Sequence, residues 1–219
     1  MKKDSLIPTV TLTIVGKESS PRIITPKDIQ DEYRRSRFDN GDFRMTYLEG
    51  LIRGGNLDAK DGFDLKFENL NSVDIDSCMG RTKFRTMSFV NVKQLIASTS
   101  IQGKWNIQTV EKVWFTDARF FYDNPDFYDA DIQWNPKAKR IDLAGSVGLR
   151  GNLDFSQVGY VDLSDADLTN IDGIKTNPEG IVFCWGQYRG RVYVPNVHYY
   201  DPEPLINAIV YHQHKKYGV

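Results

Sequence analysis

The sequence has few of the residues and patterns that mark disulfide scaffolds, membrane proteins or nucleic-acid-binding proteins. Its 219 residues contain only two cysteines, Cys78 and Cys184, which are too few for a disulfide framework or a cysteine-rich zinc site. No apolar run approaches the length of a membrane span, and no secretory apolar segment follows the charged N-terminus. The formal net charge of −1 argues against general nucleic-acid binding. We therefore predict a cytoplasmic protein that contacts neither membrane nor nucleic acid directly.

The chain also lacks the sequence motifs of common catalytic sites. It contains no Gly-x-Ser-x-Gly, no phosphate-binding loop, no His-Glu-x-x-His and no Cys-x-x-Cys. The three histidines, His198, His212 and His214, all lie near the C-terminus. The aspartates recur at a regular interval, which is typical of a surface or structural role rather than of a tuned acid–base pair. The sequence thus predicts a protein that is not an enzyme and needs no cofactor or metal.

What the sequence does contain is an internal repeat. The clearest copy runs from Val158 to Leu168 and reads apolar-x-x-apolar-x-apolar-x-x-small-x-apolar; the same spacing begins at Val110. Further copies begin at residues 70, 92 and 138, and weaker ones at 48 and 178. The period is therefore roughly 20 to 22 residues, with one short and one long interval. A unit of this size cannot bury its apolar side alone, so we expect successive units to stack around a shared core.

Each copy predicts a short strand, because apolar residues two positions apart lie on the same face of a strand. A second apolar pair precedes most copies and is expected to pack the opposite wall of each coil. These pairs are Leu65 with Phe67, Met87 with Phe89, Trp105 with Ile107, Ile132 with Trp134, and Leu153 with Phe155. A β-sandwich with regularly spaced strands is the alternative architecture.

The repeat resembles the leucine-rich repeat, Leu-x-x-Leu-x-Leu-x-x-Asn/Cys-x-Leu, over about residues 48 to 190. Its residue pattern is most similar to that of short, divergent bacterial repeats of the BspA-like kind. The position that the family gives to Asn or Cys holds Asn56 and Cys78 here, but small residues such as Ala118 and Ala166 in other copies. The resemblance implies a solenoid of about six to seven strand-containing repeats with an irregular hydrogen-bond ladder.

The segments on either side of the repeats are predicted to be caps, which divides the chain into residues 1–47, 48–190 and 191–219. Residues 6–15 alternate like a strand, and a helix is predicted from Thr25 to about Arg37. At the other end, a strand at 191–195 is expected to pair with residues 181–185 as a hairpin, before a capping helix that begins at Asp201. The predicted fold class is therefore an α+β, or mainly β, repeat solenoid with helical caps.

Residues that lie between core positions of the strands are expected to face solvent in two columns. The first column consists of Asp74, Ile96, Trp114, Asp142, Asp162 and Val182, and the second includes Lys112, Arg140 and Tyr160. Tryptophan, tyrosine and arginine dominate binding energy at protein interfaces. From these columns we predict that Ile96, Trp114, Lys112, Arg140, Tyr160, Asp142 and Asp162 contact a partner protein. A slip of one residue in the register would turn Trp114 inward.

An acidic and aromatic insertion lengthens the interval between the repeats at 110 and 138. Insertions in solenoids form loops on one face and often carry binding. The residues predicted to contact a partner here are Tyr122, Asp123, Asp126, Phe127, Tyr128 and Asp129. An equally good interpretation is a long loop whose aromatic side chains fold back on the neighbouring repeat. A calcium site is disfavoured, because the glycine and terminal glutamate of a known calcium loop are missing.

Three functions agree with these patterns. The first is a non-enzymatic solenoid that binds another protein through its strand face and the acidic loop. The second is an inhibitor of the phage or pathogen type, whose acidic loop occupies a basic groove of a nucleic-acid-handling host complex. The third is a carbohydrate-binding surface, with Trp114 and Tyr160 as stacking platforms. A fold alone does not separate them, but a steep loss of binding with rising salt would favour the inhibitor. We predict the first.

Overall fold

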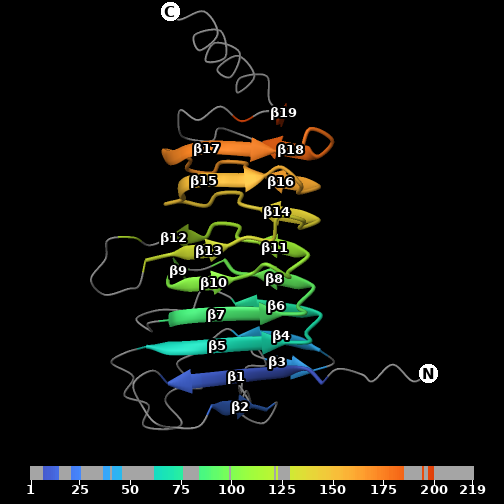
Figure 1. The fold of residues 1–219 in the computed structure, drawn as a ribbon, viewed down its shortest axis with the longest axis vertical. Coiled ribbons are helices and arrows are strands. Elements are labelled where there is room, and N and C mark those ends of the chain that lie inside the picture. The colour runs from blue at the N-terminus through green and yellow to red at the C-terminus, as the bar shows by residue number, and fades with distance from the viewer. Residues whose placement is uncertain are drawn as a thin grey trace, which may run out of the picture. The chain divides into compact units, whose positions relative to one another are not determined.

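The computed structural model describes residues 7–14, 21–25, 37–39, 41–45, 62–75, 84–98, 100–120, 122, 129–184, 194 and 197–199. These residues fold as a β-solenoid, in which strands are the only regular elements (Figure 1). The chain divides into two compact units. One comprises residues 1–113 and 121–135, and the other comprises residues 114–120 and 136–219. The solenoid predicted from the repeat is therefore confirmed for the described part of the chain.

The first unit contains one complete sheet and part of a second. The order of the complete sheet is β13 (Asp131–Gln133), β10 (Lys104–Asn106), β7 (Phe84–Val90), β5 (Phe63–Glu68), β1 (Thr9–Ile14) and β2 (Arg22–Ile24). Strands β5, β7, β10 and β13 run parallel, as successive coils of a solenoid must, whereas β1 is antiparallel to both of its neighbours. The strand predicted at residues 6–15 is thus confirmed as β1.

A second row of strands in this unit follows the order β8 (Gln94–Ile96), β6 (Ser72–Ile75), β4 (Asp42–Met45) and β3 (Arg37–Asp39). Strands β4, β6 and β8 are parallel, and β3 and β4 form an antiparallel pair. The short strand β9 (Ser100–Ile101) also belongs to this unit. Strand β11 (Lys112–Trp114) begins in the first unit and ends in the second.

The second unit repeats the arrangement with later residues. Its parallel row consists of β14 (Arg140–Asp142), β16 (Tyr160–Asp162), β18 (Ile181–Cys184) and β19 (Val197–Tyr199). A parallel pair, β15 (Arg150–Phe155) and β17 (Asn170–Thr176), forms the other wall, and β12 (Arg119–Phe120) is a further short strand. In Figure 1, β14, β16 and β18 lie as successive rungs, which aligns equivalent side chains in columns.

The apolar frame of the repeat lies in the core, as predicted. In the copies that begin at residues 70, 92, 110, 138 and 158, the first three apolar positions are at most 2 % exposed, and the small Ala118, Ser146 and Ala166 are at 0 %. The small position of the copy at 92, Ser100, is only half-buried. The buried small residues close tight turns: the N–H groups of Ala118 and Ser146 donate to the carbonyls of Phe115 and Leu143, each over 3.0 Å. A larger side chain at the small position would have to displace packed neighbours.

Aromatic rings from successive coils stack along the core of the first unit. Phe43 and Phe67 meet edge to face at 5.3 Å, Phe67 and Phe89 stack at 5.0 Å, and Phe89 lies 5.8 Å from Trp105. The indole N–H of Trp105, which is 0 % exposed, donates to the carbonyl of Gln102 over 2.9 Å. Each ring pair adds about 0.5–1.5 kcal/mol beyond the area that it buries, which links neighbouring coils.

The predicted register of the last copy, which begins at residue 178, is wrong by one residue. Val161 pairs with Val182, so Val182 is in the core at 1 % exposed and Ile181 is 49 % exposed. The cause is a bulge in β17, where Gly151 pairs with Ile171 but the next pair is Asn152 with Gly173. The extra residue, Asp172, shifts everything after it by one position, and a shift of one residue exchanges the two faces of a strand.

The predictions for the two ends of the chain have mixed outcomes. The helix predicted from residue 25 to about 37 cannot include Arg37, which begins β3, and the rest of it apart from Thr25 lies outside the described residues. The C-terminal helix and the weak copy at residue 48 also fall outside them. The predicted closing hairpin is wrong, because both edges of β18 are occupied by parallel strands, β16 and β19. The weak copy at residue 48 was predicted to supply the coil before β6. The structure places β4 there instead, and β4 precedes that copy in the sequence.

Candidate functional site

The outward face of β14, β16 and β18 in the second unit carries four of the residues predicted to contact a partner, namely Arg140, Asp142, Tyr160 and Asp162. Side chains alternate along a strand, so the buried Ile141, Val161 and Val182 fix which neighbours point outward. One outward column consists of Arg140, Tyr160 and Ile181, and the next consists of Asp142, Asp162 and Phe183. Trp114 lies beside this row, because the N–H of the following Phe115 donates to the carbonyl of Asp142 over 2.8 Å. We call these seven residues the strand face.

Arg140 lies at the centre of the strand face between two aromatic rings. Its guanidinium carbon is 4.5 Å from the ring centroid of Tyr160 and 5.7 Å from that of Trp114. Both distances are within the range of a cation–π contact, which contributes about 0.5–1 kcal/mol at exposed sites and about 2 kcal/mol or more when desolvated. The arginine is thus held in one orientation by rings from the coils on either side of it.

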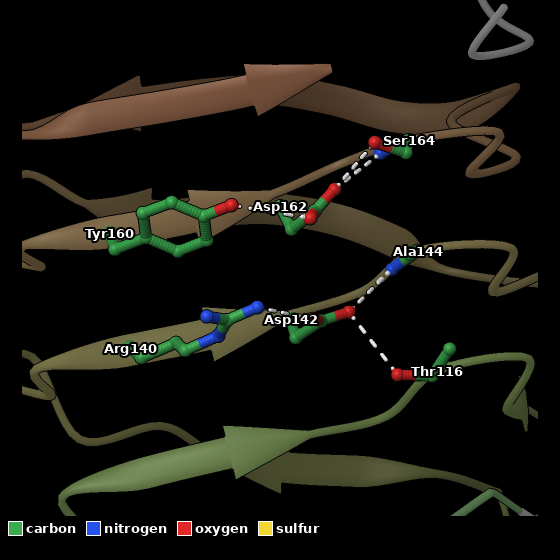
Figure 2. A network of polar contacts seen from close by, with 7 residues as sticks. All are labelled: Thr116, Arg140, Asp142, Ala144, Tyr160, Asp162 and Ser164. Atoms are coloured by element: carbon green, nitrogen blue, oxygen red, sulfur yellow. Dashed lines mark hydrogen bonds and ion pairs between the residues drawn. The ribbon is translucent and has the colours of Figure 1, made fainter. Parts of the chain in front are cut away.

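Asp142 pairs with Arg140 and also shapes the turn that follows its own strand. Its Oδ2 accepts a hydrogen bond from Nη2 of Arg140 over 2.9 Å. Its Oδ1 accepts hydrogen bonds from the N–H of Ala144 over 3.1 Å and from the hydroxyl of Thr116 over 3.2 Å (Figure 2). An aspartate that accepts from the N–H two residues later forms an Asx turn, so Asp142 has a structural role at the end of β14.

Asp162 makes the same turn one coil later. Its Oδ1 accepts hydrogen bonds from the N–H of Ser164 over 3.0 Å and from the hydroxyl of Ser164 over 2.6 Å. The hydroxyl of Tyr160 donates a longer bond, of 3.4 Å, to Oδ2 (Figure 2). Burial raises the pKa of Tyr160 above its usual value, and the negative charge of Asp162 raises it further.

The apolar part of the strand face lies on β18. Ile181 is 49 % exposed and pairs in register with Tyr160, and the half-buried Phe183 pairs with Asp162. The face therefore combines one exposed aliphatic side chain, three half-exposed aromatic side chains, one arginine that is stacked and ion-paired, and the largely buried Asp142 and Asp162. Aromatic residues and arginine are enriched in the cores of protein interfaces, whereas aspartate is depleted there.

The structure brings together five of the predicted partner-binding residues, namely Trp114, Arg140, Asp142, Tyr160 and Asp162. Trp114, Arg140 and Tyr160 are half-buried on the outward side, as the predicted register requires. The two aspartates differ from the expectation of a solvated surface: Asp142 is 6 % exposed and Asp162 is 8 % exposed, because both bond to their own turns.

The other predicted residues lie elsewhere. Half-buried Ile96 and exposed Lys112 belong to the first unit, so the expected apolar spot of Ile96 and Trp114 is not established as one surface. In the acidic insertion, Tyr122 is half-buried and Asp129 is exposed. The remaining insertion residues, Asp123, Asp126, Phe127 and Tyr128, lie outside the described residues.

Four residues of the site were missed from the sequence: Ile181, Phe183, Thr116 and Ser164. Ile181 and Phe183 were predicted to lie in the core, because the bulge in β17 shifts the register of β18 by one residue from the one predicted. Ser164 carries a readable signal, because Asp162-x-Ser164 is the spacing of an Asx turn closed by a second hydroxyl bond. The same spacing occurs at Asp167-x-Thr169, where the hydroxyl of Thr169 donates to Asp167 over 2.6 Å. Thr116 carries no such signal, because its bond to Asp142 joins residues 26 positions apart.

Comparison of the chain with known proteins finds no matching family model, no matching curated protein and no matching solved structure. The resemblance to leucine-rich repeats thus stays a prediction. No helix among the described residues has the length and apolar character needed to cross a bilayer. Within the same residues, no group of three or more histidine, cysteine, aspartate or glutamate side chains is arranged to hold a metal ion.

Proposed function

We propose that this chain is a non-enzymatic binding protein whose strand face contacts another protein. The observation that carries the proposal is the fixed position of Arg140 between Trp114 and Tyr160, with the exposed Ile181 in register on the other side of Tyr160. Interface energy is concentrated in tryptophan, tyrosine and arginine side chains that are rigid before binding, since a rigid side chain loses little entropy on association.

The same geometry favours protein binding over the carbohydrate alternative. A sugar-stacking platform needs an open ring face, but Trp114 and Tyr160 each direct a face toward Arg140. The inhibitor alternative depends on the acidic insertion, most of which lies outside the described residues, and no observation on the strand face requires a basic groove. Both alternatives stay predictions.

Site-specific photo-crosslinking tests the proposal directly. A benzophenone amino acid would replace Ile181 in one variant and Val147 in a matched control. Val147 is an apolar residue of the same unit that is 38 % exposed but lies outside the strand face. We expect a discrete crosslinked protein in cell extract from position 181 and none from position 147.

The crosslinked protein would then be purified, and its affinity measured for the variants Ile181→Glu and Val147→Glu. Residues at the centre of an interface cost more than about 1–2 kcal/mol when they are lost, so we expect Kd to rise about tenfold or more for the first variant only. Equal crosslinking at both positions, or equal affinities of the two variants, would show that the strand face is not the binding surface.

A further inference from the structure

The two neighbouring aspartates of the strand face differ in their charge partners. Asp142 forms an ion pair with Arg140, whereas Asp162, its register partner in the next coil, accepts hydrogen bonds from no described residue other than Ser164 and Tyr160. No lysine, arginine or histidine among the described residues lies within 4.0 Å of the Asp162 carboxylate. The same position in successive coils thus has a cation in one coil and lacks one in the next.

This difference leaves the site with excess negative charge. Arg140 supplies one positive charge and the two aspartates supply two negative charges, so the local sum is 1 − 2 = −1. Asp162 as a whole residue is 8 % exposed, and among the described residues only neutral groups donate hydrogen bonds to its carboxylate.

We propose that the strand face binds a basic segment of its partner protein, and that Asp162 and Tyr160 receive a lysine or arginine side chain from that segment. This inference rests on the proposed function. The contact between Arg140 and Asp142 within the protein shows the geometry that we expect for the partner's side chain. The guanidinium of Arg140 bonds the carboxylate of Asp142 and also lies against the ring of Tyr160.

Two further features suit a long cationic side chain at this position. Among the described residues, Oδ2 of Asp162 accepts only the long 3.4 Å hydrogen bond from Tyr160, so its capacity to accept a charge-assisted hydrogen bond is not used. The exposed Ile181, in register with Tyr160, offers apolar surface for the aliphatic stem that lysine and arginine carry. A carboxylate or phosphate of the partner would instead meet a net negative site.

A pair of matched peptides tests the charge preference. The probe is Ac-Leu-Val-Arg-Val-Leu-amide, and its control replaces the arginine with citrulline, which has nearly the same shape but no charge. Both would be titrated into the full chain labelled with ¹⁵N and followed by NMR. We expect the arginine peptide to shift the amide of Ser164 and to bind at least fivefold more tightly than the citrulline peptide.

Two protein variants locate the effect. Asp162→Asn keeps an acceptor for both Ser164 bonds but removes the charge, so we expect the two peptides to bind it equally. Asp154→Asn is the matched control: Asp154 makes the equivalent turn to Ser156 in the same unit, and its side chain is 58 % exposed beside Lys175. This control should keep the full preference for arginine.

Thermal unfolding separates a binding role from a structural one. If the carboxylate of Asp162 is kept for a partner, Asp162→Asn should leave the Tm of the free protein unchanged or raise it; a clear drop in Tm would overturn the inference. Equal affinity of the native protein for the two peptides, or no binding of the arginine peptide, would also overturn it. The proposed function would still stand in either case if the crosslink at position 181 formed.

Discussion

Arg140 gives the sharpest test of how the strand face is organised. The substitution Arg140→Met keeps a long apolar side chain but removes the charge and the planar group. Two cation–π contacts of about 1 kcal/mol each would be lost. The ion pair with Asp142 adds no more than about 1 kcal/mol, because the arginine side chain is 36 % exposed. We therefore expect the free energy of unfolding to fall by about 2–3 kcal/mol.

The change would be measured by urea unfolding followed by circular dichroism. For a chain of this size, each kcal/mol corresponds to about 2–4 °C in Tm, so the expected loss is roughly 5–10 °C. Arg140→Lys should lie between the two proteins, since lysine keeps the charge but not the flat guanidinium. Arg119→Met, at an exposed arginine of β12 in the same unit, is the control and should stay within about 0.5 kcal/mol of the native value. If Arg140→Met behaves like Arg119→Met, the stacked arrangement does not stabilise the coils.

Three further substitutions test the fold and the site. Gly148 has a φ of 82°, so Gly148→Ala should lose about 1–2 kcal/mol of unfolding free energy to backbone strain, and more because the new Cβ would clash with the carbonyl oxygen of Phe120. Gly151 has a φ of 77° but no atom within 4 Å of the new Cβ, so Gly151→Ala should lose only the amount due to backbone strain. Equal losses of the two variants in urea unfolding would contradict the clash. Trp105→Ala should cost about 3–5 kcal/mol by the same assay, and a loss under about 1 kcal/mol would refute its place in the core. Tyr160 has a raised pKa in the folded protein, so its contribution is complete below the usual tyrosine pKa of about 10 and is lost as pH rises above it. Alkaline unfolding of Tyr160→Phe should therefore be less steep, and an unchanged profile would refute the shift.

The sequence predicted the core better than any other part of the fold. Apolar residues at a fixed interval identify which side chains point inward, and the first positions of the five clear copies are buried, namely Leu70, Val92, Val110, Ala138 and Val158. This works because burial of apolar surface dominates folding and depends on local spacing. The strand β1 and the outward position of Arg140, Tyr160 and Trp114 follow from the same rule.

The failures occur where the chain departs from its own period. One extra residue in β17, Asp172, moved Ile181 to the surface and Val182 to the core. A bulge leaves little signal in a sequence, because it adds a residue without breaking the strand pairing on either side. The wrong hairpin at β18 has a related origin, since local alternation predicts a strand but does not say which strand pairs with it.

The repeat thus determined by itself that the described chain coils into stacked strands around an apolar core and, up to the copy at residue 158, which columns of residues face outward; the bulge in β17 reversed the last copy. Only the tertiary structure decided what those columns do. Arg140 and Asp142 lie two residues apart, but Trp114 and Tyr160 reach the guanidinium from other coils, and contacts between coils depend on the register of the whole stack. Asp142 and Asp162 differ in both respects: the sequence places Arg140 two residues before one and Tyr160 two residues before the other, and the fold adds the hydroxyl of Thr116 from another coil to Asp142.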